Sequence, residues 1–402
     1  IAKWESVLPE FKPPSGSASH PSVRYSACAV AHAGELVVTH GYFYNHAIHH
    51  PAWQSNAWAF NFRTRSWRQV HRGEEWGAPS ARYSASCVLG PDGALYMFGG
   101  DDGGHKQSMH NYIFRSWFDE LWRLDLRTYE WRLITPKAQL KPPKRALHAA
   151  AVVGDLMLVY GGLDKSDLWQ YSFTENRWQQ LQPAAMQQAD SHPGVRHAIS
   201  AAPDGDGFYL FGGTRHGKKL RPIVFDDLWH YSISSNTWSK RNPLGLGPPP
   251  RAHHSLVSVQ TSPSALVLYG GALCTPGCRC YGDTWLYTAE KNVWRLLNMS
   301  EQPIHRYRQS LVRDPADGSL YLFGGESYRP YMYHNAIDRL RLPKALFAST
   351  AAAAKPALGA LAAMPSHIAG PLPALLWSFC ALGALVTLCA CCSRKRRSFE
   401  PI

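Results

Sequence analysis

Histidine is the residue type in this chain with the clearest capacity for metal chemistry. His46, His49 and His50 share one segment, and His105 and His110 share a second one. Three imidazoles on converging loops can bind zinc or copper. These histidines show no fixed ligand spacing, so we expect no metal and no other cofactor at these positions.

Cysteines form a second group of reactive side chains. Cys274, Cys278 and Cys280 lie in the segment CTPGCRC, where we expect two of them to close a small disulfide in an oxidising compartment and one to remain free. Cys28 and Cys87 follow a recurring arginine by four and five residues, so we expect them on opposite faces, as buried thiols rather than a pair. Because the total of nine is odd, no complete disulfide framework follows.

The elements that position these residues belong to a repeat with six copies. Each copy opens with an arginine, continues through small and β-branched residues, and reaches an apolar run that ends in Gly-Gly, for example RYSASCV and then LYMFGG. A carboxylate or amide then precedes a Trp position by two residues, and another Trp follows in the next run. The opening arginines are Arg24, Arg82, Arg145, Arg196, Arg251 and Arg306. The acids or amides are Asn56, Glu120, Asp167, Asp227, Asp283 and Asn335.

This plan resembles the kelch repeat, which has the same opening arginine, Gly-Gly and paired aromatic positions. The resemblance implies an all-β, six-bladed β-propeller over residues 1–342, with four antiparallel strands in each blade around a central channel. Trp side chains at the repeat positions supply apolar area that packs one blade on the next. The first copy departs from the pattern, because Tyr42 replaces its second glycine.

The N-terminus carries the strand that the sixth copy lacks. The segment WESVL beginning at Trp4 matches WRQV, WRLI, WQQL and WRLL in the other copies. We therefore predict that Trp4 to Leu8 completes blade six and removes an exposed sheet edge. The chain begins with Ile rather than Met, so we expect it to be a fragment or a processed product.

The C-terminal part of the chain has the composition of a membrane anchor. Residues 372–392 form an uncharged apolar run long enough for a transmembrane α-helix. The basic tetrad 394–397 predicts a cytoplasmic tail, 393–402, and places the propeller in the lumen or outside the cell. Residues 343–371, rich in Ala and Pro, are expected to form a stalk. A tail-anchored protein with a cytosolic propeller is the alternative topology.

Three positions are candidates for covalent modification. Asn298 begins the sequon Asn-Met-Ser and is a glycosylation site if the propeller is lumenal. Cys391 and Cys392 adjoin the basic tetrad and are candidates for S-acylation, with a simple apolar helix as the alternative.

The long connections between the second and third strands of the blades define the expected recognition surface. They differ from blade to blade and lie on one face of the propeller, and such loops on a rigid scaffold commonly bind partners. The candidate contact residues have the types that dominate protein interfaces. They are Tyr112, Phe114, Arg115, Trp117, Tyr328, Arg329, Tyr331 and Tyr333.

The recurring arginines allow two interpretations. They could form a cationic ring for an acidic ligand, or each could pair internally with the acid or amide of its blade, which we favour. The formal net charge is +13, and the Lys and Arg residues are spread over the propeller, so we expect no nucleic acid as a partner.

The sequence therefore predicts a membrane-tethered interaction module that binds a protein or a glycan. One alternative is an enzyme of the galactose-oxidase-like propeller type with His and Arg at the channel mouth, although the chain has no phosphate loop, nucleophile elbow or HExxH motif. The other alternative is the C-terminal module of a larger receptor or processing enzyme.

Overall fold

The computed structural model describes the propeller and its closing strand. The described residues are 2–10, 19–45, 50–73, 76–103, 106–107, 113–114, 116–184, 191–217, 221–262, 264–274, 278–299, 301–328, 330–343 and 346. Residues Ile1–Ala348 form one compact unit. The predicted stalk, transmembrane span and tail, with Cys391 and Cys392, lie outside the described residues, and within those residues no helix is long and apolar enough to cross a membrane.

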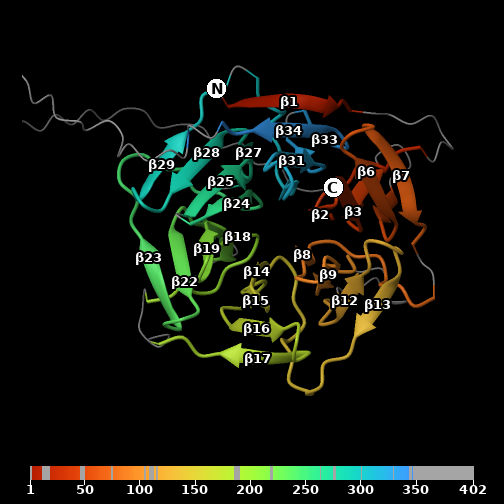
Figure 1. Ribbon diagram of the computed structural model, residues 1–402, viewed down its shortest axis with the longest axis horizontal. Coiled ribbons are helices and arrows are strands. Elements are labelled where there is room, and N and C mark those ends of the chain that lie inside the picture. The colour runs from red at the N-terminus through yellow and green to blue at the C-terminus, as the bar shows by residue number, and fades with distance from the viewer. Residues whose placement is uncertain are drawn as a thin grey trace, which may run out of the picture. The chain divides into compact units, whose positions relative to one another are not determined.

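Six antiparallel sheets of four strands surround a central axis (Figure 1). In blades one to five the strands follow chain order from the axis outward. Blade one contains β2 (Cys28–His32), β3 (Glu35–Thr39), β6 (Ala57–Asn61) and β7 (Ser66–His71). Blade two contains β8 (Ser86–Leu89), β9 (Leu95–Phe98), β12 (Leu121–Leu124) and β13 (Trp131–Ile134). Blade three contains β14 (Ala149–Val153), β15 (Leu156–Tyr160), β16 (Leu168–Ser172) and β17 (Arg177–Leu181).

The remaining blades repeat this order, and the last one uses the N-terminus. Blade four contains β18 (Ser200–Pro203), β19 (Gly207–Phe211), β22 (Leu228–Ser232) and β23 (Thr237–Arg241). Blade five contains β24 (Ser255–Thr261), β25 (Ser264–Tyr269), β28 (Thr284–Thr288) and β29 (Val293–Leu296). Blade six contains β30 (Ser310–Arg313), β31 (Leu320–Phe323), β34 (Ile337–Arg341) and β1 (Lys3–Leu8).

The pairing of β1 with β34 confirms the predicted ring closure. Trp4 lies opposite Leu340 in the antiparallel register of these strands. Its indole Nε1 donates a hydrogen bond of 3.0 Å to Thr284 Oγ1 in blade five, and its ring centroid lies 5.1 Å from that of Tyr269. The N-terminal strand is thus fixed both by its own sheet and by the neighbouring blade.

The core consists of apolar layers between adjacent blades, because each sheet buries both faces. Between blades two and three, for example, Phe98 packs against Trp178 with ring centroids 4.9 Å apart. The Gly-Gly pairs end the second strands in the left-handed region, where Gly100 has a φ of 107°. A Cβ at Gly99 would lie 2.6 Å from the carbonyl oxygen of Arg145, so this turn requires glycine.

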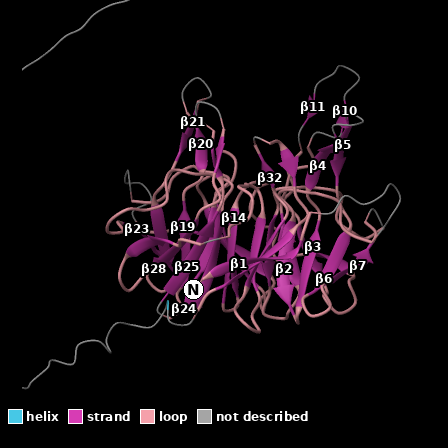
Figure 2. Cartoon of the chain, turned by 90° about the horizontal axis from the view of Figure 1, so that it is seen from above, coloured by secondary structure: helices cyan, strands magenta, loops and turns pink. Residues whose placement is uncertain are grey.

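Five of the long connections that the sequence suggested as loops contain two-stranded hairpins. Figure 2 shows these hairpins projecting from one side of the propeller, which we call the hairpin face. They are β4–β5 (Tyr42–Asn45, His50–Trp53), β10–β11 (Lys106–Gln107, Ile113–Phe114), β20–β21 (Thr214–His216, Pro222–Val224), β26–β27 (Ala272–Leu273, Arg279–Cys280) and β32–β33 (Glu326–Ser327, Met332–Tyr333). Sequence reasoning missed them because their strands are short and lack a clear apolar alternation.

Candidate functional site

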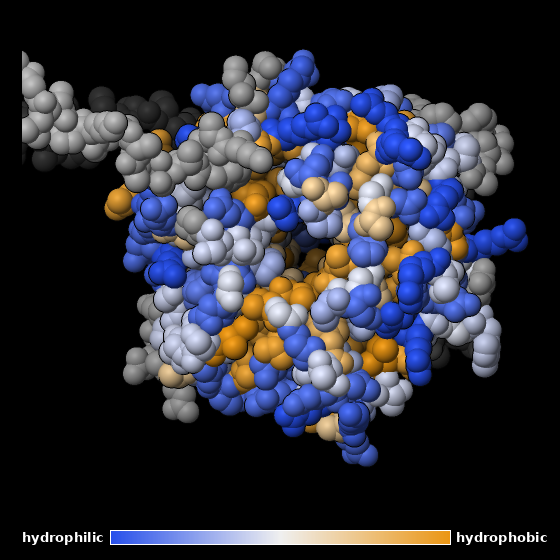
Figure 3. Space-filling model, in the orientation of Figure 1, coloured by the Kyte–Doolittle hydropathy of each residue, from blue (hydrophilic) through white to orange (hydrophobic). Residues whose placement is uncertain are grey.

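A closed cycle of backbone hydrogen bonds surrounds the channel mouth on the hairpin face. Its six members lie two residues after the opening arginines and have positive φ angles of 48° to 59°. The amide N–H of each member donates to the carbonyl oxygen of its counterpart in the preceding blade, with N···O distances of 2.8 to 3.2 Å. The members, which we call the mouth ring, are Ser26, Ser84, Leu147, Ala198, His253 and Arg308. Figure 3 shows one face of the propeller with the central hollow of the channel.

The residues of the mouth ring have left-handed φ angles, which residues other than glycine rarely adopt. Left-handed φ angles cost roughly 1 kcal/mol or more per residue. The strain recurs in every blade, and each strained residue gains one inter-blade hydrogen bond. The mouth therefore has a fixed diameter, and its side chains project from a rigid base.

A cluster of tyrosines around one arginine lies beside this mouth. The ring centroid of Tyr25 lies 5.1 Å from that of Tyr42 and 5.7 Å from that of Tyr333. The ring centroids of Tyr42 and Tyr83 lie 5.4 Å apart. The guanidinium of Arg308 lies 5.0 Å from the Tyr25 ring centroid, within cation–π range. We call these five residues the mouth cluster; they come from blades one, two and six.

An acid at the base of blade six holds the arginine of the mouth cluster in place. Arg308 donates a hydrogen bond of 2.9 Å to the buried carboxylate of Glu326. Burial lowers the pKa of Arg308, but Glu326 and the nearby tyrosines outweigh burial and raise that pKa overall. Burial raises the pKa of Tyr25 far above its ordinary value. The mouth cluster is therefore an arginine that is paired with Glu326 and framed by tyrosines.

In most blades the opening arginine pairs with an acid of its own blade, which is the interpretation that we favoured from the sequence. Arg145 donates to both carboxylate oxygens of Asp167, at 3.0 and 2.8 Å, and Trp169 Nε1 donates to the same carboxylate at 2.6 Å. Equivalent ion pairs are Arg82–Glu120, Arg196–Asp227 and Arg251–Asp283. These guanidinium groups are buried, so they form no cationic ring for a ligand.

Two blades depart from the predicted pairing. In blade six Arg306 contacts Asp338 at 3.3 Å instead of Asn335, whose side-chain amide donates to a backbone carbonyl. In blade one the described contacts of Arg24 are with backbone carbonyls and Ser22, and none is with Asn56. The predicted partner is therefore wrong in both blades: blade six pairs its arginine with a different acid, and blade one has no Arg–acid or Arg–amide pair among its described contacts.

The comparisons with known proteins agree with this repeat geometry. The KLHDC2/KLHL20/DRC7 Kelch-repeats domain matches residues 4–162 and, in an overlapping second match, residues 115–325. The chain belongs to the kelch-repeat family. Kelch domain-containing protein 2 of Bos taurus is 24% identical over 303 residues, which cover 69% of this chain and 69% of that protein.

Other matched proteins are much longer than the region that this chain covers. The flagellar outer-arm dynein alpha chain of Chlamydomonas reinhardtii is 26% identical over 283 residues, covering 62% of this chain but 6% of that one. Host cell factor of Drosophila melanogaster is 25% identical over 250 residues, covering 58% and 15%. The solved structure of YjhT superposes with a TM-score of 0.58 and 15% identity over 83% of this chain and 96% of that one, and so shares the fold.

Two of the four predicted contact residues of blade six lie at the mouth. The hydroxyl groups of Tyr331 and Tyr333 lie 2.9 Å apart, and the Tyr331 hydroxyl donates to Glu326 at 3.2 Å. Tyr328 lines a separate groove of about 860 Å³ between blades five and six, together with Arg279. The blade-six prediction thus identified two positions around the mouth and one in the groove.

The structure describes only some of the predicted contact residues of blade two. Trp117 is half-buried at the base of its hairpin and forms an isolated bridge with Asp101. Phe114 belongs to β11, and its side chain is not described. Tyr112, Arg115 and Arg329, like most of the candidate metal-binding histidines, lie outside the described residues.

The described part of the kelch domain contains none of the five candidate metal-binding side chains. Within those residues no group of three or more His, Cys, Asp or Glu side chains is placed to hold an ion. Of the predicted histidines, His46, His49, His105 and His110 lie outside the described residues, and His50 lies in β5 without a described side chain.

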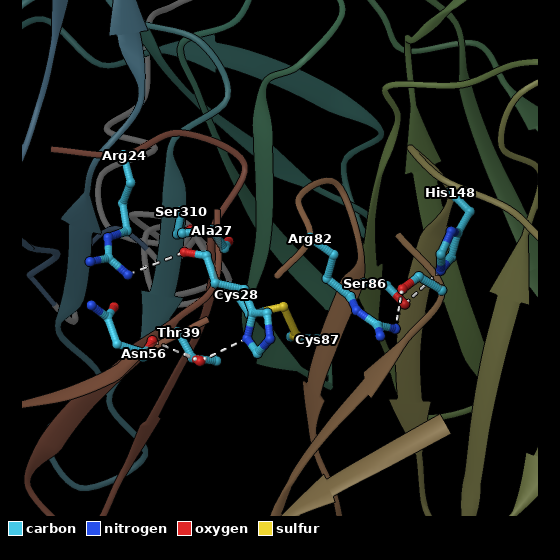
Figure 4. The surroundings of a disulfide bond; sticks show 12 residues. Arg24, Ala27, Cys28, Thr39, Asn56, Arg82, Ser86, Cys87, His148 and Ser310 are labelled. Atoms are coloured by element: carbon cyan, nitrogen blue, oxygen red, sulfur yellow. Dashed lines mark hydrogen bonds between the residues drawn. A yellow bond between two sulfur atoms is a disulfide. The ribbon is translucent and has the colours of Figure 1, made fainter. Parts of the chain in front are cut away.

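The cysteine predictions have mixed outcomes. Cys274 and Cys278 form the expected small disulfide, and Cys280 is free. The prediction that Cys28 and Cys87 are separate buried thiols is wrong, because they form a disulfide between β2 and β8 (Figure 4). Adjacent blades contact one another through opposite faces of their sheets. Side chains that point to opposite faces of two neighbouring blades therefore meet between the blades, as Cys28 and Cys87 do.

Sequence reasoning missed the central members of the mouth cluster. Tyr25 and Tyr83 directly follow opening arginines, and Tyr42 directly follows the glycine of blade one. These positions have the appearance of ordinary strand residues in the repeat. The available signal was that blades one, two and six carry Tyr after the arginine, whereas the other three carry Ala or His.

Proposed function

We propose that this kelch propeller is an interaction module that binds a protein partner through its hairpin face. The observation that carries the proposal is the mouth cluster, in which Arg308 lies among Tyr25, Tyr42, Tyr83 and Tyr333 on a rigid base. Tyrosine and arginine are enriched among the residues that dominate binding energy at interfaces. Their confinement to one side of the mouth favours a partner that inserts a side chain or short segment there.

We further propose that a helix at 372–392 anchors the propeller on the non-cytosolic side of a membrane. The uncharged run and the following basic tetrad support this topology. The two disulfides support it as well, because such bonds persist in oxidising compartments. Asn298 is exposed, as a glycan acceptor must be.

The binding proposal is tested with a random peptide library displayed on phage and selected on the immobilised full chain. We expect enriched peptides to lose affinity by about tenfold or more for Tyr333→Ala, as is typical of a truncated hot-spot residue. Trp76→Ala is the matched control, because Trp76 is fully exposed and lies in a connection outside the mouth cluster. Peptides that bind Tyr333→Ala normally, or lose binding to Trp76→Ala, contradict the proposal.

The topology is tested by protease protection on sealed microsomes, combined with glycosidase treatment. A protected propeller whose size shifts with the glycosidase supports the non-cytosolic placement. A propeller digested from outside, without a shift, contradicts it and favours the tail-anchored alternative. Asn298→Gln serves as the control that assigns the size shift to this sequon.

A further inference from the structure

The hairpin of blade four carries an unusual concentration of positive charge. The segment 214–225 contains Arg215, Lys218, Lys219 and Arg221 and no acidic residue. Arg215, His216 and Arg221 are exposed, and the two lysines lie outside the described residues. We call the described residues 214–217 and 221–224, which include the strands β20 and β21, the basic hairpin.

The hairpin geometry orients these arginines, and the Arg215 guanidinium lies 5.9 Å from the ring centroid of Phe225 at the base of the hairpin. The amide of Gly217 donates to the carbonyl oxygen of Arg221 at 2.9 Å and closes the two strands. Arg215 lies opposite Ile223 in the register, and cross-strand partners project from the same face of a hairpin. His216 projects from the other face, where its ring centroid lies 5.2 Å from that of His197 beside the mouth. Figure 2 shows this hairpin extending beyond the blades.

The two arginines of the basic hairpin differ from several other surface arginines because they have no acidic partner among the described residues. Arg123 pairs with Asp92, and Arg68 pairs with Glu35, even though these are surface positions. Within the described residues neither Arg215 nor Arg221 forms an ion pair. An unneutralised row of cations on a projecting element creates a local field that attracts anionic ligands.

The chemistry of the hairpin favours one class of anion. Among its described residues the exposed ring is that of His216, which lies against His197, and the hairpin encloses no pocket for a single phosphate. A linear polymer with repeated, permanently ionised groups fits exposed arginines that are spaced along a projecting hairpin. The neighbouring hairpin adds exposed Arg279 on the same face.

We propose that the basic hairpin binds a sulfated polysaccharide. The inference deepens the proposed function by naming a partner class for the hairpin face, and it rests on the non-cytosolic placement of the propeller. Binding is electrostatic, so it weakens steeply as salt is added. The mouth cluster and the basic hairpin then serve different ligands on one face.

The test measures binding of heparin to the full chain and to two double variants with equal loss of charge. Arg215→Ser/Arg221→Ser removes the proposed site. Arg132→Ser/Arg295→Ser removes two exposed cations from the outer strands β13 and β29. We expect the heparin Kd to rise about tenfold or more for the first variant and to change less than about twofold for the second. Both variants should keep the melting temperature, because exposed substitutions have little effect on stability.

Several outcomes overturn the proposal. Equal weakening by both variants shows a general charge effect, and an unchanged Kd for the first variant shows that the hairpin does not bind heparin. Desulfated heparin that binds as well as heparin contradicts the requirement for sulfate. Stronger, hairpin-dependent binding of polyglutamate or of phosphatidylserine vesicles assigns the surface to an acidic protein or to a membrane. The peptide-library test does not use these arginines, so the two proposals fail independently.

Discussion

Asn56 stands beside Arg24 where blades two to five place a carboxylate beside the opening arginine (Figure 4). Arg24 is fully buried and donates to the carbonyl oxygens of Ser22 and His40, each at 3.2 Å. Burial lowers the pKa of Arg24 to about 9. Asn56 Oδ1 and Trp58 Nε1 are both buried without a hydrogen-bond partner. Blade one therefore has an uncompensated cation next to two unused polar atoms.

Asn56→Asp should stabilise the propeller. The new carboxylate would accept from both Arg24 and Trp58, as the carboxylates of blades two to five accept from their own arginine and Trp. A hydrogen bond to a charged group contributes about 1.5–3 kcal/mol, from which the cost of burying the acid is subtracted, so we expect a gain of about 1 kcal/mol. Denaturant unfolding measures it. Gln180→Glu adds the same charge at an exposed site, and equal stability of the two variants would contradict the prediction.

Trp4→Ala should strongly destabilise the ring closure. Trp4 is buried between blades five and six and loses its packing and its hydrogen bond to Thr284 in this variant. Truncation of a buried Trp costs about 3–5 kcal/mol. Chemical unfolding followed by Trp fluorescence gives the free energy. The control Trp76→Ala removes a fully exposed Trp and should leave stability unchanged. Similar losses in both variants would show that β1 does not close the ring.

The disulfide between Cys28 and Cys87 should contribute more stability than the one between Cys274 and Cys278. The first closes a loop of 59 residues and the second a loop of four, and the entropy removed from the unfolded chain grows with loop length. We expect Cys28→Ser/Cys87→Ser to cost about 2–4 kcal/mol. The matched variant Cys274→Ser/Cys278→Ser should cost less. Calorimetric melting of both variants measures the two losses of stability. A larger loss for Cys274→Ser/Cys278→Ser than for Cys28→Ser/Cys87→Ser would contradict the prediction.

The propeller should lose stability as the pH falls below about 6.5. Burial, aided by Arg82, lowers the pKa of His40 to about 3, and burial, aided by Arg251, lowers that of His254 to about 3. Unfolded histidine binds its proton near pH 6.5, whereas these folded histidines stay neutral. Below that pH the unfolded chain takes up more protons, so the free energy of unfolding falls, and above it these groups contribute no slope.

His254→Gln isolates one of these protons. Gln309 occupies the equivalent position in blade six and donates to the carbonyl oxygen of Tyr269 at 3.0 Å, so glutamine fits this place in the repeat. We expect the pH slope of the unfolding free energy to become shallower by about 1.4 kcal/mol per pH unit between about pH 6 and pH 4. Urea titrations across that range measure the slope. An unchanged slope would mean that His254 also titrates normally in the folded protein.

The blades and their closure were predictable from the sequence because their signals are local and repeated. Trp4 could be assigned to blade six since it has the same neighbours as the other fourth-strand tryptophans. The Arg145–Asp167 pair was predictable for the same reason. Such features depend on contacts within one repeat or between identical repeat positions.

The remaining features depend on relations between blades that no single repeat encodes. Cys28 and Cys87 were misjudged because side-chain alternation was applied within one blade, although the two side chains meet across a seam. Tyr25 becomes a neighbour of Tyr333 only after the ring closes and brings blade six beside blade one. Arg308 gives no sign in the sequence of its place over Tyr25.

The mouth ring has a consequence for how this protein can change its specificity. All six of its amide hydrogens and carbonyl oxygens are used between blades, so the ring offers no free backbone group to a ligand at the axis. The circle also fixes each blade relative to its neighbours independently of what the hairpins contain. A hairpin can therefore be lengthened, shortened or transplanted from one blade to another as a cassette, and recognition can diversify while the scaffold stays the same.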